Sequence, residues 1–159
     1  MTLLMKPSMP PTEWSSVLDT PTGPDTLDKI HRCLDELWSA HPELPEALRT
    51  RAILAVAEIG ANIIEYSRPG QPVRMQMQVQ VLADEVEIVF TDEGDPAHIN
   101  LDAVTMPDAM AERGRGLAIA EACLDRLTYR RDSTGNHWTL AVKRYASRDN
   151  ARESDDHRT

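Results

Sequence analysis

The alternation of apolar and polar residues from Val73 to Val81 limits the fold of this 159-residue chain more than any other feature. The odd positions are Val or Met, and the even positions are Arg74 followed by three glutamines. Successive side chains of a β-strand point to opposite faces, so this pattern predicts a strand with one buried and one exposed face. A tight turn at Ala83 and Asp84 would lead into a second strand at 85–91.

Helical patterns flank this hairpin and supply a layer that can cover its apolar face. Helices are predicted from an N-cap at Asp25 to about Ala40, from Glu46 to Tyr66, and from about Gly116 onward. A first strand is predicted at 14–19, and a last hairpin pairs 127–131 with 137–143. Hairpins with segregated helices indicate an α+β two-layer sandwich, in which three helices cover one face of a mixed, mostly antiparallel sheet.

The chain has the length of a single domain, which we expect to span residues 14–144. Residues 1–13 are expected to form a flexible arm, and 145–159, where seven of fifteen residues are charged, a solvated tail. Residues 92–113 show no strong periodicity. A segment of that length without regular structure in a small domain is typical of a functional loop or lid.

The charge balance excludes some classes of partner. With 26 acidic and 17 basic residues, and no basic cluster, the net charge of -9 argues against direct binding to nucleic acid or to an anionic membrane. The longest stretch without a charged residue is ten residues, about half a transmembrane span, and no export signal is evident. We therefore expect a cytoplasmic protein, whose Cys33 and Cys123 are reduced core residues.

Within the second helix, Glu58 and Asn62 interrupt an otherwise apolar segment. Ten of the twelve residues from Ile53 to Ile64 are apolar or glycine, which is typical of a helix buried nearly all round. Residues four apart lie on one helix face, so a carboxylate and an amide oxygen would be available there to a hard cation such as Mg²⁺. The alternative is a solvated stripe shared with Arg51 and Glu65.

Two glycine-containing motifs lie beyond the hairpin. Asp92-Glu93-Gly94-Asp95 follows a buried strand, where a carboxylate can accept a hydrogen bond from an amine and glycine permits close approach of a flat ligand. Gly114-Arg115-Gly116-Leu117 opens the third helix, where exposed N–H groups together with Arg113 and Arg115 suit phosphate oxygens. An ordinary turn and an ordinary helix cap are the alternatives.

Taken in order, these motifs resemble the Bergerat ATP-binding fold of the GHKL superfamily, and within it the anti-sigma factor serine/threonine kinases of the RsbW type. Residues 57–65 resemble the family's N-box, 91–95 its aspartate motif and 113–117 its glycine-rich motif. Residues 135–140 resemble the final hairpin. The resemblance covers roughly residues 14–143.

The resemblance implies binding of ATP and Mg²⁺, with Asn62 as the metal ligand and Asp92 as the acceptor for the adenine amine. It implies that Gly94, Gly114 and Gly116 shape the pocket and that Glu58 is the catalytic carboxylate. The remaining residues that it assigns to ATP are Arg113, Arg115, Leu117 and Thr139. The expected partners are a sigma factor, a STAS-type anti-anti-sigma protein phosphorylated on serine, and a second copy of the chain.

Departures from the family pattern at Ala61, Tyr66, Arg113 and Asn136 leave a second hypothesis open. In that hypothesis the chain is a catalytically weak or inactive module of the same fold, which acts by sequestering its partner. A third hypothesis is the detached catalytic domain of a histidine kinase, although His31 in the first helix is expected to be a surface residue.

Overall fold

A computed structural model describes residues 11–68, 70–97 and 112–145 of the chain. The helices and strands follow one another in the order expected from the periodicity. They are β1 (Trp14–Pro21), α1 (Thr26–Ala40), α2 (Glu46–Tyr66), β2 (Arg74–Val81), β3 (Glu85–Asp92), α3 (Glu112–Cys123), β4 (Arg126–Asp132) and β5 (Gly135–Lys143).

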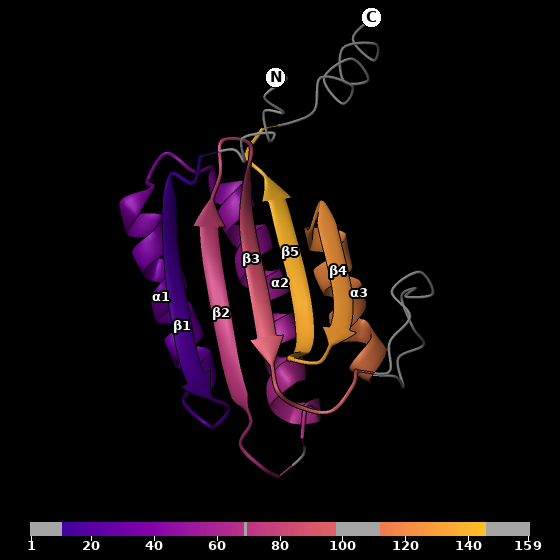
Figure 1. Ribbon diagram of the computed structural model, residues 1–159. Coiled ribbons are helices and arrows are strands. Elements are labelled where there is room, and N and C mark those ends of the chain that lie inside the picture. The colour runs from indigo at the N-terminus through magenta and orange to yellow at the C-terminus, as the bar shows by residue number, and fades with distance from the viewer. Residues whose placement is uncertain (1–10, 69, 98–111, 146–159) are drawn as a thin grey trace, which may run out of the picture.

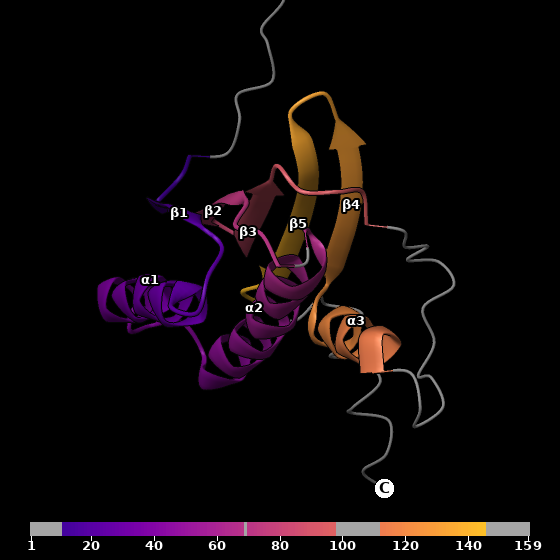
Figure 2. The same ribbon diagram turned by 90° about the horizontal axis from the view of Figure 1, so that it is seen from below.

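The five strands form one sheet in the order β1-β2-β3-β5-β4, and the three helices lie on one face of it (Figures 1 and 2). This arrangement confirms the predicted α+β two-layer sandwich. Each pair of neighbouring strands within the described residues is antiparallel, so the mixed character that we expected is not found there. β1 and β4 are the edges of this sheet.

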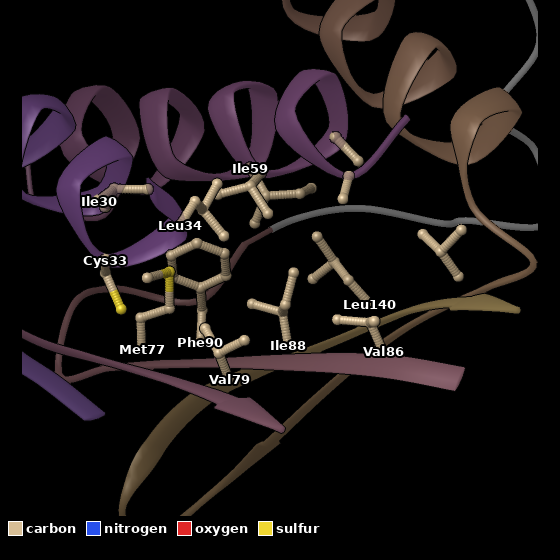
Figure 3. Close-up of a cluster of buried hydrophobic side chains, with 14 of the residues drawn as sticks. Ile30, Cys33, Leu34, Ile59, Met77, Val79, Val86, Ile88, Phe90 and Leu140 are labelled. Carbon is tan, nitrogen blue, oxygen red and sulfur yellow. The ribbon is translucent and has the colours of Figure 1, made fainter. Parts of the chain in front are cut away.

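The hydrophobic core lies between the sheet and the helices. The alternation predicted for the central strands is observed, since Met77 of β2 and Phe90 of β3 are fully buried. Ile30 and Leu34 of α1 and Ile59 of α2 cover them from the helical side (Figure 3). Complete burial of one such side chain contributes about 1.5–3 kcal/mol to stability. The helices therefore cover the sheet face that carries these apolar side chains.

The structure confirms Asp25 as the N-cap residue of α1, although its side chain makes no hydrogen bond to the helix. The adjacent Thr26 is fully buried, and its hydroxyl accepts a hydrogen bond from the N–H of Gly23 at 2.8 Å and donates to the carbonyl of Pro21 at 3.2 Å. Asp25 instead forms an ion pair with Lys29 one turn later. The turn before α1 is therefore closed by the buried threonine.

Two predictions about helices need correction. α3 begins at Glu112, four residues before the predicted start near Gly116. α2 is not buried all round, because Leu54 is 47% exposed on its outer side. The N-terminal arm up to residue 10, most of the predicted lid (98–111) and the tail from 146 onward lie outside the described residues.

Several smaller expectations can be compared with the fold. Cys33 is buried, Cys123 is half-buried, and both are free thiols. Burial raises the pKa of the Cys33 thiol. His31 is exposed on α1, as predicted. Among the described helices, none is long and apolar enough to cross a membrane.

Candidate functional site

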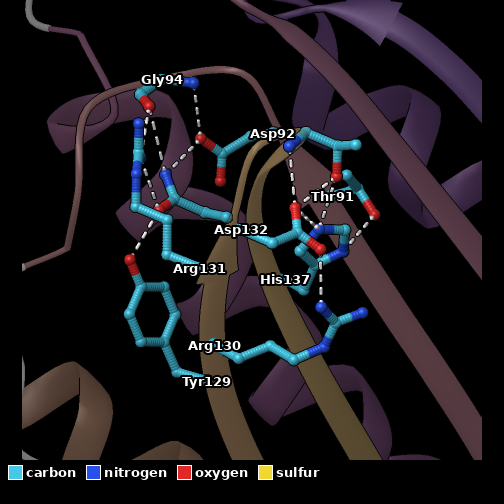
Figure 4. A network of polar contacts seen from close by, with 10 residues as sticks. Thr91, Asp92, Gly94, Tyr129, Arg130, Arg131, Asp132 and His137 are labelled. Atoms are coloured by element: carbon cyan, nitrogen blue, oxygen red, sulfur yellow. Dashed lines mark hydrogen bonds and ion pairs between the residues drawn. The ribbon is translucent and has the colours of Figure 1, made fainter.

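Asp92, the last residue of β3, is the centre of a buried polar cluster. Its side chain is almost completely buried, and Oδ1 accepts hydrogen bonds from three donors. The donors are the Ser67 hydroxyl, the Gly94 N–H at 2.9 Å and Nδ2 of Asn136 at 2.9 Å. Figure 4 shows the contact between Gly94 and Asp92. A buried carboxylate is tolerated when its charge is met by hydrogen bonds, so these donors compensate for the water that Asp92 has lost.

Three separate elements bring these donors together. Strand alternation places Asp92 on the helix-facing side of β3, and the antiparallel register pairs it with Asn136 of β5. Ser67 directly follows α2, where its N–H still donates to the carbonyl of Ile63. The cluster thus marks the point where the end of α2 meets the central strands.

Gly94 and Gly135 are required by close backbone approach at this cluster. A Cβ on Gly94 would lie 1.7 Å from the Ser67 hydroxyl oxygen and 2.7 Å from the Ser67 carbonyl oxygen. A Cβ on Gly135 would lie 2.2 Å from the carbonyl oxygen of Asp92, and Gly135 has a positive φ of 126°. The loop after β3 is therefore held against the end of α2, with the Asp95 N–H donating to the Ser67 carbonyl at 2.5 Å.

Glu58 and Asn62 lie one turn apart on α2, and both side chains are half-buried. A Cβ on Gly116 would come within 2.6 Å of Oε2 of Glu58, so α3 packs directly against this carboxylate. Two turns earlier, Nε of Arg51 donates to the carbonyl of Cys123 at the end of α3. Arg51 and Glu58 of the polar stripe therefore lie against α3, whereas Glu65 is exposed.

The profile of the histidine kinase-like ATPase domain family matches residues 20–142, most of the described fold. The chain belongs to this family. Its superfamily is the GHKL superfamily, as the motifs predicted. No curated protein matches the chain.

Among solved structures, the ATPase domain is similar to the histidine kinase domain of the blue-light activated histidine kinase EL346 from Erythrobacter litoralis. The TM-score is 0.50 and the sequence identity is 13%, with 75% of this chain and 61% of that chain covered. At this identity the likeness concerns the fold alone. The chain spans about three fifths of the length of that structure.

The residues of this ATPase domain fit the adenine end of ATP at Asp92. An ionised carboxylate is only an acceptor, and the three donors already at Oδ1 leave it able to take a further donor, such as an amine. The lack of a side chain at Gly94 lets the loop after Asp92 lie directly against Ser67 beside that carboxylate. ATP, when bound, supplies the phosphoryl group. It also brings the negative charge of its phosphates, which the rest of the site must neutralise.

The α2 pair fits Mg²⁺ in the manner usual for nucleotide sites. No group of three or more acidic, His or Cys side chains that could hold a metal occurs among the described residues. Mg²⁺ at such sites is commonly held by one or two protein oxygens together with phosphates and water, which a carboxylate and an amide oxygen one turn apart can supply. Asn62 and Glu58 are the residues that would hold it.

The glycine-rich motif lies differently from the prediction. Arg113, Gly114 and Arg115 fall within the first turn of α3, where the N–H groups before Arg115 have no partner inside the helix. Gly116 lies in the next turn, so it supplies room beside Glu58 and no free N–H group. Leu117 is buried in the core. The backbone N–H groups that the helix itself leaves without a partner in this turn are thus those of 112–114.

Thr139 is not brought to this site. It lies three residues from Asn136 along β5, so the alternation of the strand places its side chain on the outer face of the sheet. There it is paired in register with Val89 of β3. Asn136 was expected only as a departure from the family pattern, and no sequence motif indicated Ser67, Tyr129 or Arg131. The apolar alternation of Trp138, Leu140 and Val142 on β5 extends back to Asn136, and this local signal could have indicated its buried side.

The outer face of the sheet carries a separate polar network at the β4–β5 turn. Asp132 accepts hydrogen bonds from the N–H and hydroxyl of Thr134 and pairs with Arg130 at 2.7 Å and Nε2 of His137 at 3.0 Å (Figure 4). The Thr134 hydrogen bonds, with smaller contributions from His137 and Arg130, hold the pKa of Asp132 well below its usual range. This network shapes the turn and lies on the other side of the sheet from the Asp92 cluster.

Proposed function

We propose that the chain is a serine protein kinase and anti-sigma factor, which binds ATP with Mg²⁺, sequesters a sigma factor and phosphorylates a serine of a STAS-type anti-anti-sigma partner. The observation that carries the proposal is the order of Glu58 and Asn62 along α2, which ends at Ser67, the residue hydrogen-bonded to Asp92. A helix rises 1.5 Å per residue, so Glu58 lies about 14 Å along α2 from the Asp92 end. That separation suits an extended nucleotide, with its base at Asp92 and its terminal phosphate near Glu58.

Each residue then has a chemical role. Asp92 accepts the hydrogen bond of the base amine, and Asn62 directs its amide oxygen to the metal. Glu58 accepts the proton of the substrate serine hydroxyl while the serine oxygen bonds to the γ-phosphorus. At the same time the bond between the γ-phosphorus and the β-phosphate oxygen breaks, and ADP leaves. Phosphoryl transfer depends mainly on positioning and on electrostatic stabilisation, so a carboxylate held by packing between two helices suits this task.

The contact between Gly116 and Glu58 favours a second candidate, a binding module with little or no kinase activity. α3 packs on the carboxylate that would receive the serine proton, and a helix this close limits access to Glu58. In such a module the nucleotide would stabilise the fold while the partner is held without being phosphorylated. Partner binding without transfer of phosphate is the result expected from this candidate.

The experiment is transfer of γ-labelled phosphate from ATP to a purified STAS-type partner, followed by identification of the labelled amino acid. The kinase proposal predicts phosphoserine on the partner and its loss in Glu58→Gln, which keeps the size of the side chain. Glu65→Gln is the matched control, because Glu65 is exposed on the same helix. A complex with the partner that forms without labelling would refute the kinase and support the binding module.

The histidine kinase alternative is tested in the same assay. Phosphorylation of His31 would give an acid-labile label on the chain itself, and it would disappear in His31→Ala. A label that is stable to acid and confined to the partner contradicts this alternative.

A homodimer is part of the proposal, and the position of β1 supports it. β1 is an edge strand of the sheet, and such edges can pair with a second copy. Light scattering should give twice the 17.8 kDa mass of the chain, and a mass of one chain at working concentration would contradict the dimer.

A further inference from the structure

Asn136 has a hydrogen-bond partner at both ends of its side-chain amide. Its Oδ1 accepts from the Tyr129 hydroxyl at 2.5 Å and from a guanidinium nitrogen of Arg131 at 3.0 Å. Its Nδ2 donates to Oδ1 of Asp92 at 2.9 Å and to the carbonyl of Asp95 at 2.8 Å. The amide is almost completely buried, so these protein groups, and not water, decide its orientation.

The two ends of an amide have the same shape, and only their partners distinguish them. If the Asn136 amide were turned over, its oxygen would face the Asp92 carboxylate and its NH₂ would face the Arg131 guanidinium. Both contacts would be repulsive in a site shielded from water. Tyr129 and Arg131 therefore determine which end of the amide faces Asp92.

Both β4 residues are themselves held in place. The Tyr129 ring packs on Trp138, with 4.6 Å between ring centroids, and its hydroxyl accepts the N–H of Ala97 at 2.9 Å. Arg131 donates to the carbonyl of Gly94 at 2.9 Å as well as to Asn136. The contacts from β4 thus connect the loop after Asp92 to the amide that contacts Asp92.

We propose that Tyr129 and Arg131 are positioning residues that select the base of the nucleotide by orienting Asn136. With its NH₂ turned to Asp92, Asn136 keeps that carboxylate an acceptor, so the site accepts a purine with an amine at its C6 position. A purine with a carbonyl there would place oxygen against the carboxylate. The inference rests on nucleotide binding by the domain and concerns residues on β4 and β5 that act through Asp92.

The test compares ADP with inosine diphosphate, which has a carbonyl in place of the amine. Both are titrated calorimetrically into the 159-residue chain, so no turnover is needed. In the double variant Tyr129→Phe, Arg131→Ala, the affinity for ADP should fall about tenfold, in line with loss of a hydrogen bond to a charged group, while that for inosine diphosphate changes little. The preference for ADP should therefore collapse.

Arg130→Ala is the matched control. Arg130 carries the same charge on the same strand, but its contact is with Asp132 on the other face of the sheet. This variant should keep the wild-type preference for ADP. A thermal unfolding curve for each variant shows whether the protein is folded at the titration temperature.

Two results would overturn the inference. An equal loss of affinity for both nucleotides in the folded double variant would mean that Tyr129 and Arg131 are only structural. A wild-type chain that binds both nucleotides equally, or neither, would remove the selection itself. The first result leaves the kinase proposal intact, because phosphate transfer to a partner is measured separately.

A second readout needs no nucleotide. The side-chain NH₂ of Asn136 should exchange its hydrogens slowly in the wild type, as its donors are buried and hydrogen-bonded. The double variant should exchange them at least about tenfold faster, since it removes the two hydrogen bonds at Oδ1 that hold the amide in its orientation. Unchanged exchange would show that Tyr129 and Arg131 do not hold the amide.

Discussion

Gly116 of α3 lies so close to Glu58 of α2 that a Cβ at this glycine would be 2.6 Å from Oε2 of the carboxylate. The atom that it would meet is the tip of a flexible side chain, and Glu58 can rotate away at small cost. The glycine therefore matters more for the position of the carboxylate than for the stability of the fold.

Gly116→Ala should leave the free energy of unfolding within about 1 kcal/mol of the wild type, because the gain in helix propensity offsets the displacement of Glu58. Phosphate transfer to the partner should fall at least tenfold, since the carboxylate loses its position. Urea unfolding and the labelling assay measure the two effects. Unchanged transfer would show that the Glu58 position seen here is not the active one.

Gly94→Ala should behave in the opposite way. A Cβ there meets the backbone carbonyl of Ser67 as well as its hydroxyl, and backbone cannot rotate away. We expect a loss of about 1–3 kcal/mol in the free energy of unfolding, typical of overpacking, together with weaker ADP binding. Gly23→Ala is the control, because its nearest neighbour atom would be 3.7 Å away. Equal stability of the two variants would contradict the close approach.

Nucleotide titration with and without Mg²⁺ tests the roles given to Asp92 and Asn62. Asp92→Ala should lose nucleotide binding, since it removes the acceptor for the base amine. Asn62→Ala should still bind ADP but lose the gain in affinity that Mg²⁺ provides. Glu65→Ala, a change on the exposed side of α2, should match the wild type. If Asp92→Ala still bound ADP but lost the gain in affinity from Mg²⁺, while Asn62→Ala kept that gain, the two assignments would be reversed.

Asp132 predicts a pH dependence of stability. Its pKa is lower in the folded protein than in the unfolded chain, so its contribution is fully present above the unfolded pKa of about 4 and is lost as the pH falls through the folded value. Asp132→Asn should be less stable than the wild type at pH 6, and the difference should shrink progressively below pH 4. Urea unfolding at both pH values measures this, with the exposed Asp35→Asn as control. A difference independent of pH would rule out the ionised form as the cause.

Local periodicity was enough to predict the individual elements. The bounds of α2 were predicted correctly because proline and glycine flank an apolar helical run. The buried face of β2 followed from its alternation, since side-chain direction in a strand depends only on position along it. The order of these elements, with the motifs between them, was enough to predict the family.

The composition of the Asp92 cluster depended on tertiary structure. Its hydrogen bonds join Asp92 to Ser67, 25 residues before it, and to Asn136, 44 residues after it. Those contacts arise from the register between β3 and β5 and from the point where α2 ends, and neither is encoded in local periodicity. Once the register has placed Asn136 beside Asp92, alternation along β5 puts Thr139 on the other face of the sheet, and the packing of the two helices brings Gly116 of α3 against Glu58.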